Sequence, residues 1–182
     1  MRTTLAPQMI RAMARNQKRD LLEGRIFEIG NAFIPKSLPL TEYPDERETL
    51  CVGIFGEEES FYKLKGFAKV VADCFDLKFT YEAATKPFLH PYQTAEIFCN
   101  DEKIGYLGKV SYEIMDDLDM RVPSFVMELD LSLHSKYYAN EQKFIPIPKF
   151  AIETRDFAFV VDKDVSCAAI ENGIKEACKY VT

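Results

Sequence analysis

The sequence predicts an α+β fold, an antiparallel sheet flanked by helices, followed by a shorter unit that ends before its own sheet is complete. Three observations support this prediction. Several short stretches alternate apolar and polar residues, as half-buried strands do, and residues 64–75 carry apolar side chains at helical spacing. The composition then shifts at Ser135 towards polar residues and proline. We therefore expect two domains, at residues 1–144 and 145–182.

A helix is expected close to the N-terminus, where Thr3 or Thr4 can cap the first turn and Pro7 is tolerated within it. Its apolar side fits a subunit interface as well as an ordinary core face, because the pattern alone does not separate the two. That side comprises Met9, Ile10 and Met13, and the other side carries mainly Arg11, Arg15 and Lys18.

Two strands and a second helix are expected next. Residues 25–33 alternate and favour a strand, which Pro35 ends at a polar turn running through Pro39. Residues 49–55 favour another strand. Apolar residues at helical spacing then predict a helix that lays a continuous stripe on the sheet. The stripe comprises Leu64, Phe67, Ala68, Val71 and Phe75, and Lys65, Lys69, Asp73 and Asp76 are left mostly to solvent.

The rest of the first domain is expected to contain a hairpin, a short helix and a last strand. Alternation over residues 95–99 and a return strand from residue 104 place the hairpin turn at residues 100–102. Residues 111–118 favour a short helix. Residues 125–131 alternate apolar side chains with Glu128 and Asp130, which predicts a strand with one buried face and one wet face.

The second domain is expected to begin with an extended segment, because Pro146 and Pro148 bar regular strand pairing. Residues 157–161 are continuously apolar, as in a central strand covered on both faces. Ser166 can then cap a helix. One strand and one helix cannot bury their own apolar faces, so this unit is expected to be incomplete. The apolar positions of the helix are Ile170, Ile174 and Ala177.

Composition constrains the function as well as the fold. The chain has 182 residues, of which 47% are hydrophobic, and its net charge is −6. A protein that grips nucleic-acid phosphates on its own is normally basic, so a free-standing RNA-binding role is disfavoured, although local patches could still touch RNA. Neither a secretory signal nor a membrane span is recognisable, so a cytoplasmic protein without a membrane partner is expected.

No catalytic, cofactor-binding or metal-binding residue is expected. The five cysteines form no Cys-x-x-Cys pair, and their shortest spacing, between Cys167 and Cys178, fits no zinc site, so buried reduced thiols are expected. The sequence also contains no Gly-rich phosphate loop and no Gly-x-Ser-x-Gly motif.

A few polar residues allow two interpretations each. His90 could be a catalytic imidazole, but no nucleophile or acid motif lies near it, so a histidine that orders a turn is favoured. Arg155 and Asp156 fit either an RNA contact or an ion pair at the entry to a strand. The three glutamates at residues 57–59 fit a solvated loop better than a metal site, because no oxygen-ligand spacing follows them.

Several segments, in order and correctly spaced over nearly the whole chain, resemble those of one family. Residues 27–33 read Phe-Glu-Ile-Gly-Asn-Ala-Phe, and residues 87–91 read Pro-Phe-Leu-His-Pro. Each segment alone is weak, but together they resemble the beta subunits of bacterial phenylalanyl-tRNA synthetases. Further matches lie at residues 1–7, 64–66, 104–108 and 150–161.

The resemblance implies a class II aminoacyl-tRNA synthetase-like core, followed by an incomplete ferredoxin-like anticodon-binding domain. In class II enzymes, a strand like residues 27–33 leads into Phe-Arg-x-Glu, whose arginine grips the ATP phosphate and whose acid lies by the adenylate. Ile34 stands here in place of the arginine, and Lys36 in place of the acid. A second arginine, expected after the last strand of the sheet, is missing from residues 129–134. Since one such donor is typically worth about a hundred- to a thousandfold in rate, the resemblance implies a catalytically inactive fragment.

The resemblance also implies partners. The fragment would come from the C-terminal part of the subunit, pack against the catalytic alpha subunit and help to position tRNA(Phe) in a heterotetramer. That parent ligase uses ATP and magnesium, which the fragment itself would not bind. A stand-alone RNA-binding or protein-interaction module is the alternative, opposed by the net charge of −6 and the incomplete second domain. An active adenylating enzyme is opposed by Ile34 and Lys36.

Overall fold

The computed structural model describes residues 1–132 and 153–178 of the chain. The chain divides into two compact units, Met1–Glu141 and Gln142–Thr182, and each is described by itself. The expected domain boundary at residues 144–145, the polar segment that precedes it and the two prolines that follow it lie outside the described residues.

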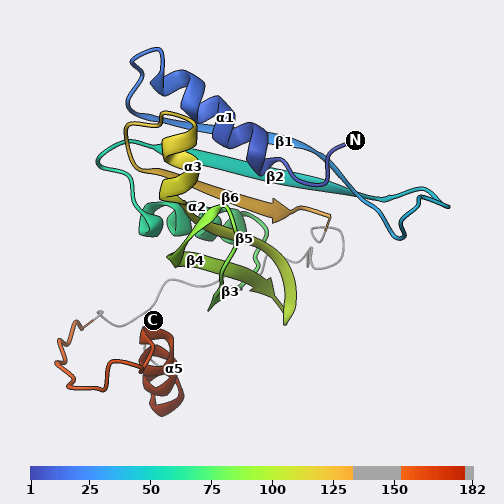
Figure 1. The fold of residues 1–182 in the computed structure, drawn as a ribbon. Helices are drawn as coiled ribbons and strands as arrows, with labels where there is room; N and C mark the ends of the chain where they lie inside the picture. The colour runs from blue at the N-terminus through green and yellow to red at the C-terminus, as the bar shows by residue number, and fades with distance from the viewer. Residues whose placement is uncertain (133–152, 179–182) are drawn as a thin grey trace. The chain divides into compact units, whose positions relative to one another are not determined.

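A six-stranded antiparallel sheet forms the first unit (Figure 1). Its strands are β1 (Gly24–Ile34), β2 (Asp45–Phe55), β3 (Phe79–Ala83), β4 (Leu89–Cys99), β5 (Glu102–Val110) and β6 (Ser124–Asp130). They lie in the order β1-β2-β6-β5-β4-β3, so β1 and β3 are the edges and β6 lies inside the sheet. The expected hairpin between β4 and β5 is confirmed, and its turn residues Asn100 and Asp101 have the positive φ angles that a two-residue turn requires. The short edge strand β3 was not expected from the sequence.

Helices cover both faces of this sheet (Figure 1). α1 (Ala6–Gln17) and α3 (Tyr112–Asp117) pack on one face, and α2 (Phe61–Cys74) packs on the other. Met13 of α1 is buried in one hydrophobic cluster with Val126, and Leu64 of α2 is buried in another with Met127. The apolar side of α1 is therefore a core face.

The prediction that one face of β6 meets solvent is wrong. Val126 and Ser124, on the side expected to meet solvent, are fully buried beneath α1. The buried amide of Gln17 donates from Nε2 to Ser124 Oγ at 3.0 Å, which satisfies this hydroxyl away from water. Alternation alone predicted one covered face, whereas a strand at the centre of the sheet has a helix on each side.

The predicted helices of the first unit are confirmed. Ser60 caps α2 by accepting a hydrogen bond from the N–H of Lys63, and Ser111 caps α3 in the same way. The predicted stripe of α2 faces the sheet, although its burial is graded. Leu64 and Ala68 are fully buried, whereas Phe67 is only half-buried.

The second unit matches the prediction only in its helix. α5 (Cys167–Ala177) begins where expected, with Ser166 accepting a hydrogen bond from the N–H of Ala169. Residues 157–161 do not form the expected central strand, and the side chains of Phe157 and Val160 are exposed. The physical reason is that a strand needs a neighbour to satisfy its backbone, and residues 153–178 contain no other extended segment that pairs with it.

Candidate functional site

A hollow of about 260 Å³ lies on the α1 side of the sheet, next to the N-terminal end of that helix. Strands β1, β2, β5 and β6 all contribute to its walls, so the sheet gathers side chains that are far apart in sequence. Ile34 is among the residues that line it. The charged and polar side chains lining it include Arg47, Lys86, Lys103, Tyr106, Glu128 and Asp130.

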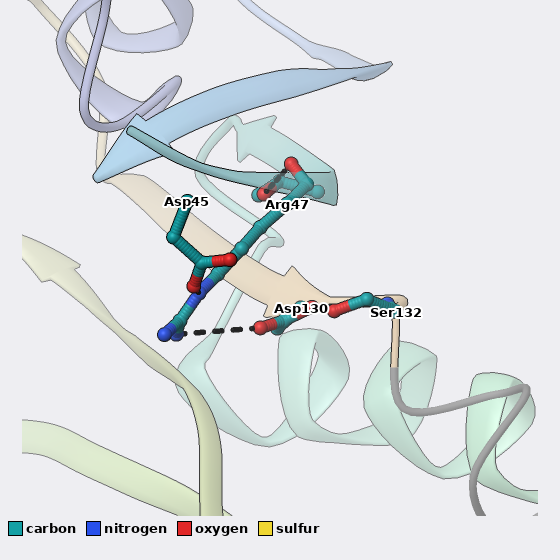
Figure 2. A network of polar contacts seen from close by, with 5 residues as sticks. Asp45, Arg47, Asp130 and Ser132 are labelled. Carbon is teal, nitrogen blue, oxygen red and sulfur yellow. Dashed lines mark hydrogen bonds and ion pairs between the residues drawn. The ribbon is translucent and has the colours of Figure 1, made fainter. Parts of the chain in front are cut away.

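Arg47 on β2 is held between two carboxylates (Figure 2). Its Nε donates to Asp45 Oδ2 at 2.8 Å, and its Nη1 lies 3.5 Å from Asp130 Oδ2 on β6. The hydrogen bond to Asp45, together with the charges of both carboxylates, raises the pKa of Arg47. Asp130 Oδ1 also accepts a 2.9 Å hydrogen bond from the backbone N–H of Ser132. The guanidinium is therefore engaged within the chain rather than free to grip a phosphate.

Glu128 on β6 holds the N-terminus of α1. Its Oε2 accepts hydrogen bonds from Thr4 Oγ1 at 2.6 Å and from the N–H groups of Leu5 and Ala6 at 3.1 and 3.0 Å. The prediction that Thr3 or Thr4 caps α1 is therefore wrong. Glu128 is the main acceptor, and Thr4 Oγ1 accepts only a longer, 3.3 Å bond from the N–H of Ala6. A carboxylate is the stronger acceptor at the positive end of a helix. The strand, rather than the preceding loop, anchors the helix.

Two weak acids beside this carboxylate are kept neutral. Burial raises the pKa of Tyr106, whose hydroxyl donates to Glu128 Oε2 at 3.2 Å. Burial likewise raises the pKa of Cys51, which is fully buried on β2. A neutral phenol remains a hydrogen-bond donor, and a neutral thiol is a poor nucleophile. Neither side chain is therefore suited to act as a base or nucleophile near neutral pH.

The two lysines of the hollow also have partners within the chain. Lys86 Nζ lies 4.3 Å from the centroid of the Tyr106 ring, which is a cation–π contact. Lys103 forms an ion pair with Glu96 on β4. Every charged side chain that lines the hollow is thus engaged. The arrangement stabilises the sheet face and the position of α1, and it offers no activated group to a substrate.

Ile34 and Lys36, which stand where the resemblance implies an arginine and an acid, do not meet in one site. Ile34, at the end of β1, lines the hollow with an aliphatic side chain. Lys36 lies in the loop after β1, where its Nζ is 3.4 Å from Glu42 Oε2 and is not part of the lining. Only the first position therefore bears on what the hollow can bind.

The structure also gives the surroundings of His90 and Arg155, for which the sequence allowed two interpretations each. His90 lies within strand β4 rather than in the expected turn. Its Nδ1 accepts a 3.2 Å hydrogen bond from the N–H of Tyr92, and its ring meets the Tyr112 ring edge-on. Arg155 Nη2 lies 2.5 Å from Glu153 Oε2, so its ion pair forms with a residue other than the adjacent Asp156.

The prediction of a solvated loop at residues 57–59 is wrong for its last residue, Glu59. The side chain of Glu59 is only 10% exposed, and its Oε1 pairs with Arg25 at 2.8 Å. Glu59 Oε2 is buried without a hydrogen-bond partner in the part of the chain that the structure describes. An acidic run suggests solvent, but β1 places the guanidinium of Arg25 beside this one carboxylate.

Sequence reasoning missed Arg47, Tyr106 and Glu128 as the residues that organise this face. The alternation of β2 could have indicated that Asp45 and Arg47 share one face, because residues two apart in a strand do. The approach of Asp130 depends on the register that pairs Thr49 with Asp130, and the sequence pattern of a single strand does not contain that register.

Residues 1–132 and 153–178 lack two further features. No group of three or more His, Cys, Asp or Glu side chains there is arranged to hold a metal ion. No helix in these two stretches combines the length and the apolar character needed to cross a membrane.

The family match and the sequence relatives agree on one family, and a solved structure shares the fold. Residues 1–131 match the family described as the phenylalanyl tRNA synthetase beta chain CLM domain. Over 96% of its length, the chain is 33% identical to the phenylalanine–tRNA ligase beta subunit of Clostridium tetani and 31% identical to that of Clostridium acetobutylicum, and it spans 22% of each. A pyrrolysyl tRNA synthetase from Desulfitobacterium hafniense has a similar fold, with a TM-score of 0.57 over 74% of this chain and 49% of that one, at 18% identity.

Proposed function

This chain belongs to the phenylalanyl tRNA synthetase beta chain family, and on that premise we propose that it is a non-catalytic structural module of a phenylalanine–tRNA ligase beta subunit. The module packs against the catalytic alpha subunit. It helps to position tRNA(Phe) for a phenylalanylation reaction in which the assembled, cytoplasmic ligase uses ATP and magnesium. The chain spans 22% of the two Clostridium relatives, so these roles belong to a larger assembly.

The engagement of every charged side chain in the hollow beside α1 carries the non-catalytic part of the proposal. Adenylate formation needs preorganised positive groups aimed at a phosphate. Arg47 is neutralised by Asp45 and Asp130, and Ile34 offers no donor. The carboxylates that could hold magnesium are occupied by Arg47 and by the N-terminus of α1. The residues present therefore do not fit magnesium-bound ATP.

Uncovered apolar side chains support packing against another subunit. Phe27 and Ile29, two residues apart on the edge strand β1, are 72% and 54% exposed. Since residues two apart share one face of a strand, both side chains lie on the same face of β1. Exposed apolar side chains grouped on one face are a feature of surfaces that pack against a partner.

Two measurements on the purified 182-residue chain test the proposal. Phenylalanine-dependent ATP–pyrophosphate exchange should be absent for the chain and for Ile34→Arg, because one added guanidinium supplies neither magnesium ligands nor a second clamp. The catalytic subunit in its native ligase serves as the positive control. Sedimentation of the chain with separately purified alpha subunit should show a complex. Exchange by the chain alone would overturn the non-catalytic assignment, and RNA binding without alpha-subunit binding would favour a stand-alone module.

A further inference from the structure

Three arginines stand at four-residue intervals along the solvent side of α1 and its end. Arg11, Arg15 and Arg19 are all exposed, and none has a carboxylate within 4.0 Å among the described residues. The other four arginines of residues 1–132 each form an ion pair. These pairs are Arg2 with Glu28, Arg25 with Glu59, Arg47 with Asp45, and Arg121 with Asp20.

The contrast matters because the chain is acidic. With a net charge of −6, a guanidinium on this surface has many carboxylates available, and most of the arginines have found one. Lys18, the neighbouring basic residue, is paired with Asp119 at 2.9 Å. Three guanidinium groups without an ion pair among the described residues therefore place uncompensated positive charge along one side of α1 and the turn after it.

The row borders concave surface rather than a smooth convex one. Arg11 and Arg15 line a groove of about 630 Å³ between α1 and β1, whose apolar part includes Ile26 and Leu118. A smaller hollow of about 200 Å³ lies between Arg15 and Arg19. A partner can therefore approach the guanidinium groups closely and lose water from them, which strengthens charge-assisted hydrogen bonds.

The spacing selects an extended polyanion. Four residues of helix advance about 6 Å, so Arg11 and Arg15 lie about 6 Å apart along α1, and Arg19 follows in the turn beyond the helix end at Gln17. A single small anion is too short to reach all three groups. Guanidinium groups bind phosphate through two parallel hydrogen bonds, and a nucleic-acid strand presents phosphates at close, regular intervals. We propose that Arg11, Arg15 and Arg19 form a docking row for the phosphate backbone of RNA.

This inference rests on the proposed function, in which the chain belongs to an assembly that handles tRNA. The row would add a backbone contact that orients RNA without reading its sequence, since phosphate contacts fix position and carry no base information. It is distinct from the hollow beside the N-terminus of α1, which Arg47 and Glu128 line. An acidic protein segment is the other occupant that such a row could take, and the experiment separates the two.

The test measures binding of the full 182-residue chain to a fluorescently labelled RNA hairpin from about 50 to about 200 mM salt. The triple variant Arg11→Gln, Arg15→Gln, Arg19→Gln should bind at least about tenfold more weakly at the lower salt. The slope of log affinity against log salt should fall by about 2 to 3, because each lost phosphate contact removes about 0.9. A triple variant of exposed lysines elsewhere, Lys63→Gln, Lys69→Gln and Lys78→Gln, removes the same charge and should change neither quantity.

Several results would overturn the proposal. These are no RNA binding by the parent chain at the lower salt, an unchanged slope in the arginine variant, or an equal loss in the lysine variant. Stronger binding of a polyglutamate peptide than of the RNA hairpin would assign the row to an acidic protein instead. Alpha-subunit binding by the arginine variant is measured in parallel. If the arginine variant still binds the alpha subunit and its RNA binding is unchanged, the docking row alone is refuted. If the parent chain does not bind the alpha subunit, the proposed function is refuted.

Discussion

Glu128 shows how much of this fold can depend on one side chain. A single carboxylate oxygen accepts hydrogen bonds from Thr4, Leu5, Ala6 and Tyr106, and so joins α1 to the centre of the sheet. Three of these donors come from the first residues of α1 or the turn before it. The negative charge also opposes the positive end of the helix dipole.

Glu128→Gln should therefore lower the free energy of unfolding by about 1 to 3 kcal/mol, as when a charged acceptor is lost from a partly buried network. The amide keeps the shape and one acceptor oxygen but loses the negative charge, so its hydrogen bonds to the donors and its interaction with the helix dipole are weaker. Urea denaturation measures the change. Glu57→Gln, in an exposed turn, is the matched control and should stay within about 0.5 kcal/mol of the parent. Equal stability of the two variants would show that Glu128 does not anchor the helix.

Because the neutral form of Tyr106 is the one that fits the fold, the chain should become less stable in alkaline solution. Burial raises its pKa above the value of tyrosine in an unfolded chain, about 10, so the unfolded state releases this proton first as pH rises. The stability contributed by the neutral phenol is therefore complete below about pH 10 and is lost as pH rises from there towards the folded-state pKa.

Tyr106→Phe should accordingly lose less free energy of unfolding than the parent chain between about pH 9 and pH 11, although it is less stable at neutral pH for want of the hydrogen bond to Glu128. Urea denaturation at a series of pH values measures both effects. Tyr92→Phe is the control, because Tyr92 is 91% exposed. Identical pH profiles for the two variants would contradict the role given to Tyr106.

At the scale of elements, local patterns predicted α2, α3, α5 and the β4–β5 hairpin because each is specified by nearby residues. Ser60 and Ser166 cap their helices from the adjacent position, and residues 100–101 supply the turn. The predictions failed where distant residues decide. The cap of α1 comes from Glu128, and the second covered face of β6 comes from α1. A pattern read along one segment contains no information about either partner.

Within α2, the apolar stripe is not uniform, and this predicts an order of mutational effects. Leu64 is fully buried against the sheet, whereas Phe67 is half-buried and has the Arg25 guanidinium 5.5 Å from its ring centroid. Leu64→Ala should cost about 2 to 5 kcal/mol, because the cavity it leaves is enclosed. Phe67→Ala should cost about 1 to 3 kcal/mol, since water can fill the space that is left.

Thermal and urea unfolding of the two variants measure this order. Val70→Ala serves as the control, because Val70 is on the same helix and is 57% exposed. A larger loss for Phe67→Ala than for Leu64→Ala would mean that the stripe packs through its aromatic side chains rather than through Leu64 and Ala68.

At the scale of the whole molecule, apolar residues left uncovered were the hardest feature to predict. Residues 157–161 look like a buried strand because they are continuously apolar, yet the side chains of Phe157 and Phe159 are 75% and 57% exposed. An apolar composition indicates that such a segment packs against another part of a protein, but it does not identify that packing partner. The candidate site shows the same limit, because Ile34 was recognisable from a resemblance, whereas the Arg47 network depends on strand register.

The two edges of the sheet differ in a way that predicts how the chain behaves on its own. β3 is five residues long, whereas β1 runs for eleven residues. Within residues 1–132 and 153–178, the edge of β1 is covered at one end, where the Arg2 carbonyl accepts a hydrogen bond from the N–H of Phe33. Long edge strands with apolar side chains pair readily with other chains.

Ile29→Lys should therefore reduce concentration-dependent self-association of the isolated chain, with little effect on its stability, because this side chain is 54% exposed. Sedimentation equilibrium over a concentration series measures the association. Val70→Lys, an equally exposed substitution on α2, should leave it unchanged. Equal effects of the two lysines would attribute the association to general charge rather than to the edge of β1.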